Sequence, residues 1–388
     1  MTNSIIANPS LSHLPFSPIR TMFNAAAEMD NVLHLSIGQP DFDGPAHIVA
    51  VHKRALTDGH TRYALDAGMP ELRQAVADRY NQLYDIRLKP TNVLITTGCC
   101  QAMYMAIHAL TCPGKEWIVT EPAFVFSHVI AQAGGIQRRI VTTPDNGYQI
   151  DPQQVIDAMS DNTCGILLNS PGNPTGAVMP VETLTPILEE AARRGIGVLS
   201  DEVYDRLILD DIDYPTALVH APSLHHVVMA SSLSKSYALP GLRIGWAISS
   251  EENIVALQRM HMFISTTEHT AAQHAAVAAL EGDQSCVANM VAAYRQRRDR
   301  LVKIFNETPC INGYSPGGAF FVMPSFPACT DSFDFAMRML KEIKVCTIPG
   351  GAFGDSCNHA LRISFATDID TIERAMEKMI PWLEKQSS

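Results

Sequence analysis

Short apolar runs alternate with helix-period stretches from Asn92 to Ser249, and this alternation restricts the fold more than any other feature of the sequence. The runs are too short for helices, and they lack the alternation of polar and apolar residues that marks a half-exposed strand. They are therefore expected to be strands buried on both faces. Such strands, separated by helices, predict an α/β fold in which helices cover both sides of a mostly parallel sheet.

The expected strands of this region span residues 93–96, 117–120, 165–168, 196–199, 227–230 and 244–248. The expected helices around them span residues 71–84, 101–110 and 181–194. After residue 265 come a helical stretch rich in Ala, a long charged helix around 292–305, and short strands at 319–323 and 361–364. This order predicts a second, smaller α/β domain.

The chain is expected to divide into three parts. Residues 1–30 contain Pro9, Pro15 and Pro18 and show little periodicity, which indicates an arm that packs with the small domain or with a partner chain. Residues 31–280 are expected to form the large domain, and residues 281–388 the small C-terminal domain. A chain of 388 residues is long enough for two such domains.

Charge and composition restrict the partners and the location. The formal net charge of −11 opposes a nucleic-acid partner, because non-specific affinity for nucleic acid rests on clustered Lys and Arg. The N-terminus lacks the features of a signal peptide and no apolar stretch reaches the length of a membrane span, so a cytoplasmic location is expected. The nine Cys include no C-x-x-C pair and the 14 His no H-E-x-x-H, so the sequence predicts neither a disulfide framework nor a metal site.

Three of the expected strands run into unusual polar residues at their carboxyl ends. The three continuations are Asn169-Ser-Pro-Gly-Asn-Pro-Thr-Gly176, Ser200-Asp-Glu-Val-Tyr204 and Ser231-Ser-Leu-Ser-Lys-Ser236. The carboxyl ends of parallel strands meet at one edge of a sheet, where open α/β proteins bind their ligands. An amide, a carboxylate and a lysine are therefore expected to converge, which predicts a cofactor site.

These motifs resemble those of the class I and II aminotransferase family, which are fold-type I enzymes that depend on pyridoxal 5′-phosphate (PLP). The resemblance runs from Ile37 to Arg362, and its motifs occur in order; they are Asn173-Pro-Thr-Gly176, Asp201-Glu-Val-Tyr204, Ser231-Ser-Leu-Ser-Lys235 and Gly241-Leu-Arg243-Ile-Gly245. It implies a large domain with a mostly parallel, seven-stranded sheet, plus a smaller α/β domain. It also implies transfer of an amino group between an amino acid and a 2-oxo acid by a ping-pong mechanism.

The resemblance gives roles to the residues around the cofactor ring. Lys235 would hold PLP as a Schiff base and, once the substrate displaces it, would move a proton between the substrate Cα and the cofactor. Asp201 would pair with the protonated ring nitrogen, and the alternative for this residue is a helix N-cap. Tyr204 and Asn173 would hydrogen-bond the phenolic oxygen of the ring. Phe124 would cover the ring face, although a lone Phe is otherwise more typical of a core.

The phosphate of the cofactor would bind where an expected strand turns into a helix. Free N–H groups and the helix dipole favour an anion at this place, whose residues are Gly98, Cys99 and Cys100. Ser232 would add a hydroxyl group and Arg243 a cation.

Arg362 lies in an otherwise apolar strand, where an unpaired charge is costly. It resembles the family arginine that binds the substrate α-carboxylate, and Gly38 and Asn173 would assist it. Tyr63 resembles the tyrosine that reaches the phosphate in a partner chain. The resemblance therefore implies a homodimer whose sites are built from two chains.

The choice of amino donor is expected to follow the side chains at the entrance. Some dicarboxylate-specific relatives carry a lysine in the phosphate loop at the position of Cys100, and a thiol does not supply that charge. Phe16, Ile19 and Phe124 are apolar, so a neutral apolar or aromatic donor is expected. Arg20 in the arm is the alternative cation for a distal carboxylate, unless it is a solvated surface residue.

Two other functions share some of these features. A β-eliminating lyase for cysteine-type substrates uses the same cofactor motifs, so Lys235 and Asp201 do not separate it from a transferase. A regulatory sensor fused to a DNA-binding module is opposed by the acidic charge and by motifs that begin near Leu35. Residues 355–360 lack the second glycine that many relatives carry there, so this loop is expected to differ in shape.

Overall fold

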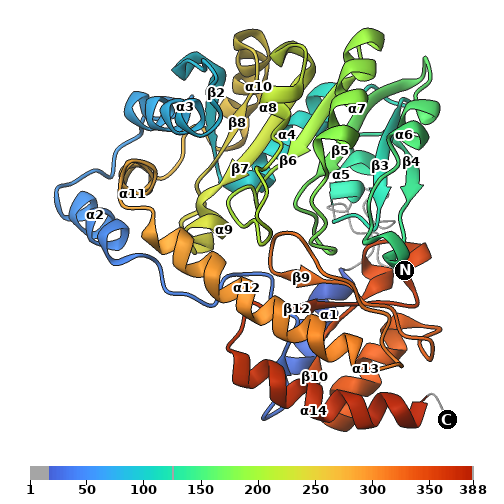
Figure 1. The fold of residues 1–388 in the computed structure, drawn as a ribbon. Helices are drawn as coiled ribbons and strands as arrows, with labels where there is room; N and C mark the ends of the chain where they lie inside the picture. Colours follow the sequence, from blue (N-terminus) through green and yellow to red (C-terminus); the bar gives the residue numbers. More distant parts are fainter. Residues whose placement is uncertain (1–16, 125, 387–388) are drawn as a thin grey trace, which may run out of the picture.

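The computed structural model describes residues 17–124 and 126–386, and Phe16 lies outside them. Figure 1 shows a larger part built around one sheet and a smaller part formed by the C-terminal elements. We call these the sheet part and the C-terminal part, the latter comprising residues 285–386.

The sheet has seven strands in the order β2-β8-β7-β6-β5-β3-β4. They are β2 (Val93–Thr96), β3 (Glu116–Glu121), β4 (Ile136–Val141), β5 (Thr163–Asn169), β6 (Gly197–Asp201), β7 (Val227–Ser232) and β8 (Gly245–Ile248). All neighbours pair in parallel except β8, which is antiparallel to both β2 and β7. The predicted mostly parallel sheet with seven strands is confirmed.

Helices cover both faces of the sheet because its buried strands present apolar side chains to each side. Leu94 of β2 packs with α4 (Gly98–Leu110), whereas Val93 and Ile95 pack with α3 (Pro70–Tyr84) and α11 (Thr270–Glu281). The other helices of the sheet part are α2 (Ala46–Thr57), α5 (Phe126–Gln132), α6 (Pro152–Ala158), α7 (Val181–Arg194), α8 (Ala217–His220), α9 (Leu233–Ser236) and α10 (Glu251–Ile264). This doubly covered sheet is the arrangement that the unbroken apolar runs predict.

The C-terminal part packs helices against a small antiparallel sheet of order β11-β12-β9. Its strands are β9 (Phe321–Val322), β10 (Val345–Cys346), β11 (Ile348–Pro349) and β12 (Leu361–Ser364). Its helices are α12 (Ser285–Asn306), α13 (Ser332–Ile343) and α14 (Ile369–Gln386). The expected strand 361–364 coincides with β12, and the expected helix 292–305 lies within the longer α12, which begins seven residues earlier.

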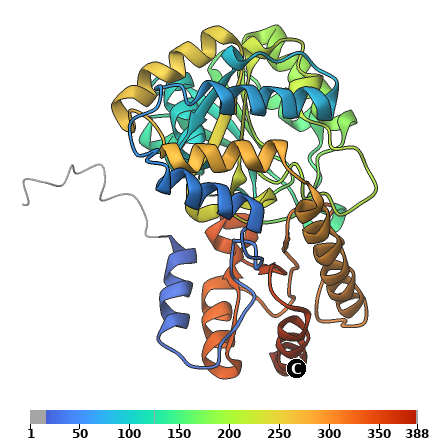
Figure 2. The same cartoon turned by 90° about the vertical axis from the view of Figure 1, so that its left-hand side faces the viewer.

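The N-terminal segment contains a helix that the sequence reading missed, α1 (Pro18–Ala27). Met22 and Ala26 lie one turn apart on its buried side, and the helix packs on β11 and α13 (Figure 2). Next along the chain, β1 (Leu33–His34) pairs in parallel with β10. The first described residues therefore pack with the C-terminal part, and the division of the chain at residues 30 and 280 stays a prediction.

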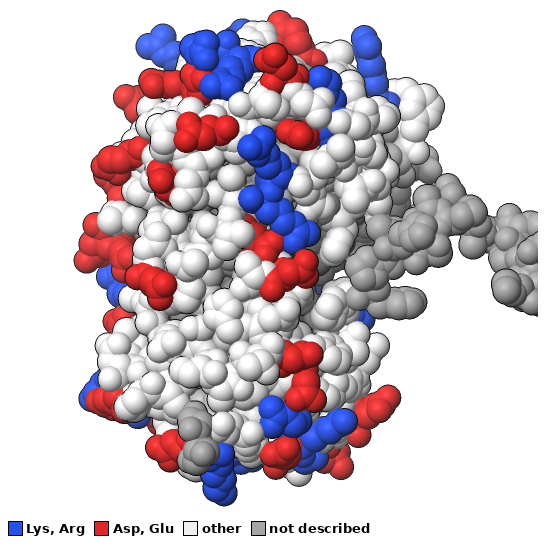
Figure 3. Space-filling model, turned by 90° about the vertical axis from the view of Figure 1, so that its right-hand side faces the viewer, with Lys and Arg blue, Asp and Glu red and all other residues white. Residues whose placement is uncertain are grey.

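Surface charge is mixed on the face that Figure 3 shows, where Lys and Arg side chains lie among Asp and Glu side chains. Within the described ranges, no helix is both long and apolar enough to cross a membrane. The same ranges contain no group of three or more His, Cys, Asp or Glu arranged to hold a metal ion.

Candidate active site

A cavity of about 410 Å³ opens at the carboxyl ends of β5, β6 and β7. Thirteen residues proposed from the sequence line it: Ile19, Arg20, Gly38, Cys99, Cys100, Phe124, Asn173, Asp201, Tyr204, Ser232, Lys235, Arg243 and Arg362. Gly98 lies directly behind the wall, since a Cβ there would meet Nη2 of Arg243 at 2.5 Å. Tyr63 does not reach this cavity within one chain, and 85% of its surface is exposed.

Lys235 enters the cavity from α9, the short helix that follows β7. The side chain of Ser232 caps this helix by accepting a hydrogen bond from the Ser234 N–H at 3.3 Å. Nζ of Lys235 donates to the carbonyl oxygen of Gly38 at 2.6 Å. Burial lowers the pKa of this amine to about 8, against the attraction of Asp201 and Cys100. The amine therefore loses its proton more readily than an exposed lysine does, and a fraction of it is neutral and nucleophilic close to neutral pH.

Asp201 ends β6 and is only 4% exposed. Its Oδ1 accepts hydrogen bonds from the Val203 N–H at 3.2 Å and from Sγ of Cys99 at 3.6 Å. The residues that follow this aspartate form a turn and not a helix, so its bond to the Val203 N–H belongs to that turn. The helix-cap alternative is therefore wrong. Burial raises the pKa of the carboxyl group to about 6, so a nearby cation would stabilise its charged form.

The first turn of α4 forms a cup of free N–H groups that could hold an anion, which we call the anion cup. Gly98, Cys99 and Cys100 are its first three residues, and their N–H groups have no acceptor within the helix. Gly245 passes so close that a Cβ there would lie 2.6 Å from the backbone nitrogen of Cys99. The guanidinium of Arg243 is held beside the cup by the carbonyl oxygens of Pro240 at 3.0 Å and Thr97 at 3.3 Å.

Arg362 projects from β12 and is only 1% exposed. Its Nη1 donates to Oδ1 of Asn173 at 3.1 Å, and its Nη2 donates to the Ser36 carbonyl oxygen at 2.8 Å. The guanidinium lies over the ring of Phe321, 4.5 Å from its centroid. Among the described residues no carboxylate pairs with it and its Nε has no partner, so this buried cation suits an anionic ligand.

Aromatic rings surround the remaining walls. Tyr204 packs edge-on against Phe320, with ring centroids 5.5 Å apart, and burial raises the pKa of its hydroxyl group. Phe124 makes an edge contact with Phe126, with centroids 5.4 Å apart. The site therefore combines a dry aromatic wall with a few buried charged groups.

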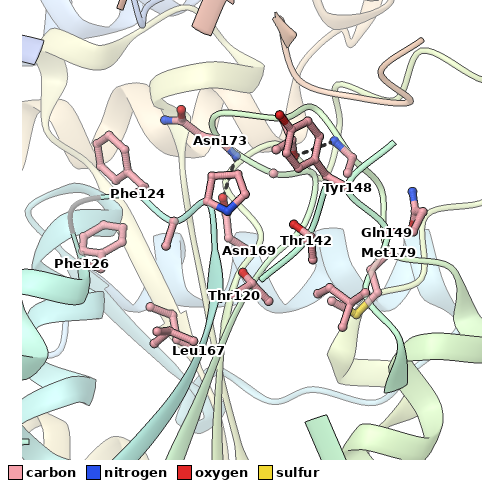
Figure 4. Close-up of a pocket in the computed structure, with 17 residues that line it drawn as sticks. Thr120, Phe124, Phe126, Thr142, Tyr148, Gln149, Leu167, Asn169, Asn173 and Met179 are labelled. Atoms are coloured by element: carbon pink, nitrogen blue, oxygen red, sulfur yellow. Dashed lines mark hydrogen bonds between the residues drawn. The ribbon is translucent and has the colours of Figure 1, made fainter. Parts of the chain in front are cut away.

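A second, smaller cavity of about 40 Å³ adjoins the first. Figure 4 shows Phe124 and Phe126 on one side of it and Tyr148 and Gln149 on the other, with Asn173 between them. Oδ1 of Asn169 accepts a hydrogen bond from the Asn173 N–H at 2.7 Å, which fixes the loop between the two cavities. The backbone of Asn173, whose side-chain amide bonds Arg362, is therefore fixed by Asn169.

Sequence reasoning missed several residues that complete the site. Phe126 and Phe23 line the cavity, and Ser36 contributes only a backbone carbonyl. The spacing of Phe126, two residues after Phe124, was the one available signal, whereas a backbone carbonyl leaves none in the sequence.

Comparisons with known proteins agree with this geometry. Residues 30–379 match the family described as aminotransferase class I and II. The chain is 34% identical to an aspartate aminotransferase of Pyrococcus horikoshii, covering 95% of each chain, and 32% identical to an aromatic-amino-acid aminotransferase of Thermococcus litoralis, covering 94% of each. Its structure resembles that of an aspartate aminotransferase from Thermus thermophilus with maleate, with a TM-score of 0.91, 30% identity and coverage of 97% and 99%. The chain therefore belongs to the class I and II aminotransferase family and is an aminotransferase.

Proposed function

We propose that this aminotransferase uses PLP bound to Lys235 to move amino groups between an amino acid and a 2-oxo acid. The observation that carries the proposal is the convergence of three ionisable groups on one cavity, two of them buried and one partly buried. Lys235, Asp201 and Arg362 supply an amine, an acid and an unpaired cation there.

The residues present fit the cofactor chemically. The cup at Gly98–Cys100 with Arg243 would bind the phosphate, and glycine at 98 and 245 leaves room that a Cβ would fill. Asp201, whose pKa is raised by burial, gains from a protonated ring nitrogen next to it. When bound, PLP supplies an electron-accepting ring that stabilises negative charge on the substrate Cα.

The side chains of this chain then handle protons and charge. Lys235, once it leaves the Gly38 carbonyl, is the buried base that removes and returns the proton at Cα. Oδ1 of Asn173 is occupied by Arg362, so its amide N–H groups are the part free to donate to the phenolic oxygen, together with the Tyr204 hydroxyl. Arg362 would bind the substrate α-carboxylate, with Gly38 beside it.

The entrance supports a neutral apolar or aromatic donor. Ile19 and Phe23 of α1 line the cavity together with Phe124 and Phe126, and burial of a donor side chain against them contributes roughly 1.5–3 kcal/mol. Arg20 lines the same cavity and is the cation that would accept the distal carboxylate of an acidic co-substrate. Relatives named for aspartate, for aspartate and prephenate, and for aromatic amino acids are consistent with a site for both kinds of side chain.

A second copy of this chain is the proposed partner. Tyr63 and Leu65 lie in one exposed loop, next to exposed Phe263 and Ile264 at the end of α10. The hydroxyl of Thr267 donates to the Leu65 carbonyl oxygen at 3.3 Å, which ties the two exposed apolar groups together. An apolar surface of this kind favours association, and it would bring Tyr63 to the phosphate cup of the partner.

Absorbance spectra test the proposal directly. Purified protein reconstituted with PLP is expected to show a visible band that phenylalanine converts to the amine form in one stoichiometric turnover without an oxo acid. A cysteine-type substrate distinguishes a transferase from the lyase alternative. Sustained release of pyruvate without a 2-oxo acid as acceptor would show a lyase.

A further inference from the structure

A buried polar cluster lies behind the anion cup, and the proposed catalytic steps do not use it. It consists of Thr97, Gln101, His261, Ser265 and Glu268. His261 is 0% exposed and Glu268 is 4% exposed. The ionisable side chains of His261 and Glu268 are thus removed from water next to the first turn of α4.

Glu268 is the centre of the cluster. Its Oε1 accepts hydrogen bonds from Nε2 of His261 at 2.8 Å, from the Thr97 hydroxyl at 3.1 Å and from the Ser265 hydroxyl at 3.2 Å. One carboxylate oxygen therefore joins the end of α10 to the residue that precedes α4.

Thr97 is fixed through all of its polar groups. Its N–H donates to Oε1 of Gln101 at 2.6 Å, its hydroxyl donates to Glu268, and its carbonyl oxygen accepts from Nη2 of Arg243 at 3.3 Å. Nε2 of Gln101 in turn donates to the Ser265 hydroxyl at 2.8 Å. Since Thr97 is the N-cap of α4, these bonds set the direction of the three N–H groups that follow it.

Stability alone does not account for a carboxylate in this place. Buried polar side chains seldom stabilise a fold more than apolar residues of similar volume would, because they lose their hydration. Within the described residues, Oε2 of Glu268 and Nδ1 of His261 have no hydrogen-bond partner. Burying these two groups therefore costs folding free energy, and the bond that results fixes Thr97 at the start of the anion cup.

We propose that Glu268, oriented by His261, is a positioning residue that holds the phosphate-binding turn through Thr97. This inference rests on the proposed binding of PLP at the same turn. Among the described residues, the carboxylate reaches the cavity directly through Thr97 and also through Ser265 and Gln101. Both routes end at the first turn of α4, so the carboxylate is expected to act on the phosphate contact.

The test compares PLP with pyridoxal, which lacks the phosphate, in apo-protein titrations followed by absorbance. Glu268→Gln keeps an acceptor oxygen and removes its charge, so it is expected to weaken PLP binding about tenfold and to change pyridoxal binding less than about twofold. Glu281→Gln is the matched control, because this glutamate ends α11 and is exposed. Equal losses for both ligands, or unchanged or tighter PLP binding, would overturn the proposal.

Thr97→Val tests the same contact from the other side. It removes the hydroxyl group at nearly constant volume, so it should reproduce the selective loss and add little to Glu268→Gln in the double variant. Independent, additive losses would contradict the proposed route. Inorganic phosphate gives a reading without PLP: it should raise the melting temperature of the wild type more than that of Glu268→Gln. Failure of the wild type to bind PLP would instead count against the proposed function.

Discussion

Nζ of Lys235 lies 2.6 Å from the carbonyl oxygen of Gly38, a residue of the segment that connects β1 to α2. The amine is thus held by the chain that crosses between the two parts of the molecule. Its pKa is lowered to about 8 by burial, so the bond to Gly38 holds an amine that loses its proton easily.

Lys235→Ala should bind PLP without a covalent link. We expect transamination to fall at least about a hundredfold, since a positioned acid-base group contributes that much or more. Borohydride should fix the cofactor to wild-type protein and not to the variant, as measured by mass spectrometry. Lys89→Ala, at an exposed ion pair, is the control. Normal turnover by the Ala variant would remove Lys235 from the mechanism.

Asp201→Asn should lose activity far more than it loses cofactor. In the proposed role the carboxylate would stabilise charge that develops during proton removal, and asparagine keeps the shape of the side chain without its charge. We expect single-turnover rates to fall more than about tenfold, or about 1.4 kcal/mol. PLP affinity is measured in parallel. A smaller change in rate would show that Asp201 only stabilises the local turn through its bond to Val203.

The same substitution should stabilise the protein without cofactor. The folded-state pKa of Asp201 is about 6 and its ordinary value is 3.8, so the folded state binds more protons between these values. Stability therefore falls as pH rises through this window, by at most about 3 kcal/mol. Asp201→Asn should exceed the wild type in urea unfolding at about pH 7.5, with the gap closing toward about pH 4. A constant gap would contradict the assigned pKa shift.

Mixed dimers test the shared site. Tyr63→Ala and Lys235→Ala chains should each be nearly inactive, and mixing them after dissociation should restore about a quarter of wild-type activity, because half the dimers gain one intact site. No recovery would place both residues in one chain's site. Sedimentation of an active monomer would refute the dimer itself.

Donor choice is decided by single-turnover rates for phenylalanine, methionine and aspartate. Phenylalanine and methionine should react faster with the wild type, because Ile19, Phe23 and Phe124 bury their side chains. Arg20→Ala should slow acidic oxo acids about tenfold and leave the phenylalanine half-reaction within about twofold. A clear preference for aspartate would overturn the apolar-pocket argument.

The sheet was predictable because its central strands are buried on both faces and appear as plain apolar runs. Strand β4 was missed since it lies at the sheet edge, where Ile136 and Arg138 are exposed and the pattern looks polar. Helix α1 was missed because its start is punctuated by proline and only Met22 and Ala26 mark its buried side.

The site was predictable where one strand end supplies a whole motif, as for Asp201 and Lys235. Other contacts join distant segments, such as Arg362 with the Ser36 carbonyl and Glu268 with Thr97. A backbone acceptor has no residue type, and a buried glutamate looks like any other in the sequence. The roles given to the site residues and the limits of the domains stay predictions.

Arg362 comes from β12, and Ile19 and Arg20 come from α1, which packs on the same C-terminal part. Lys235, Asp201 and the anion cup all come from the sheet part. The residues proposed to hold the cofactor thus come from the sheet part, whereas those proposed to meet the substrate come from α1 and β12 together with Phe124 and Phe126 of the sheet part. Selection, in nature or in a mutant library restricted to residues 17–27, can retune the accepted side chain while the catalytic apparatus is inherited unchanged.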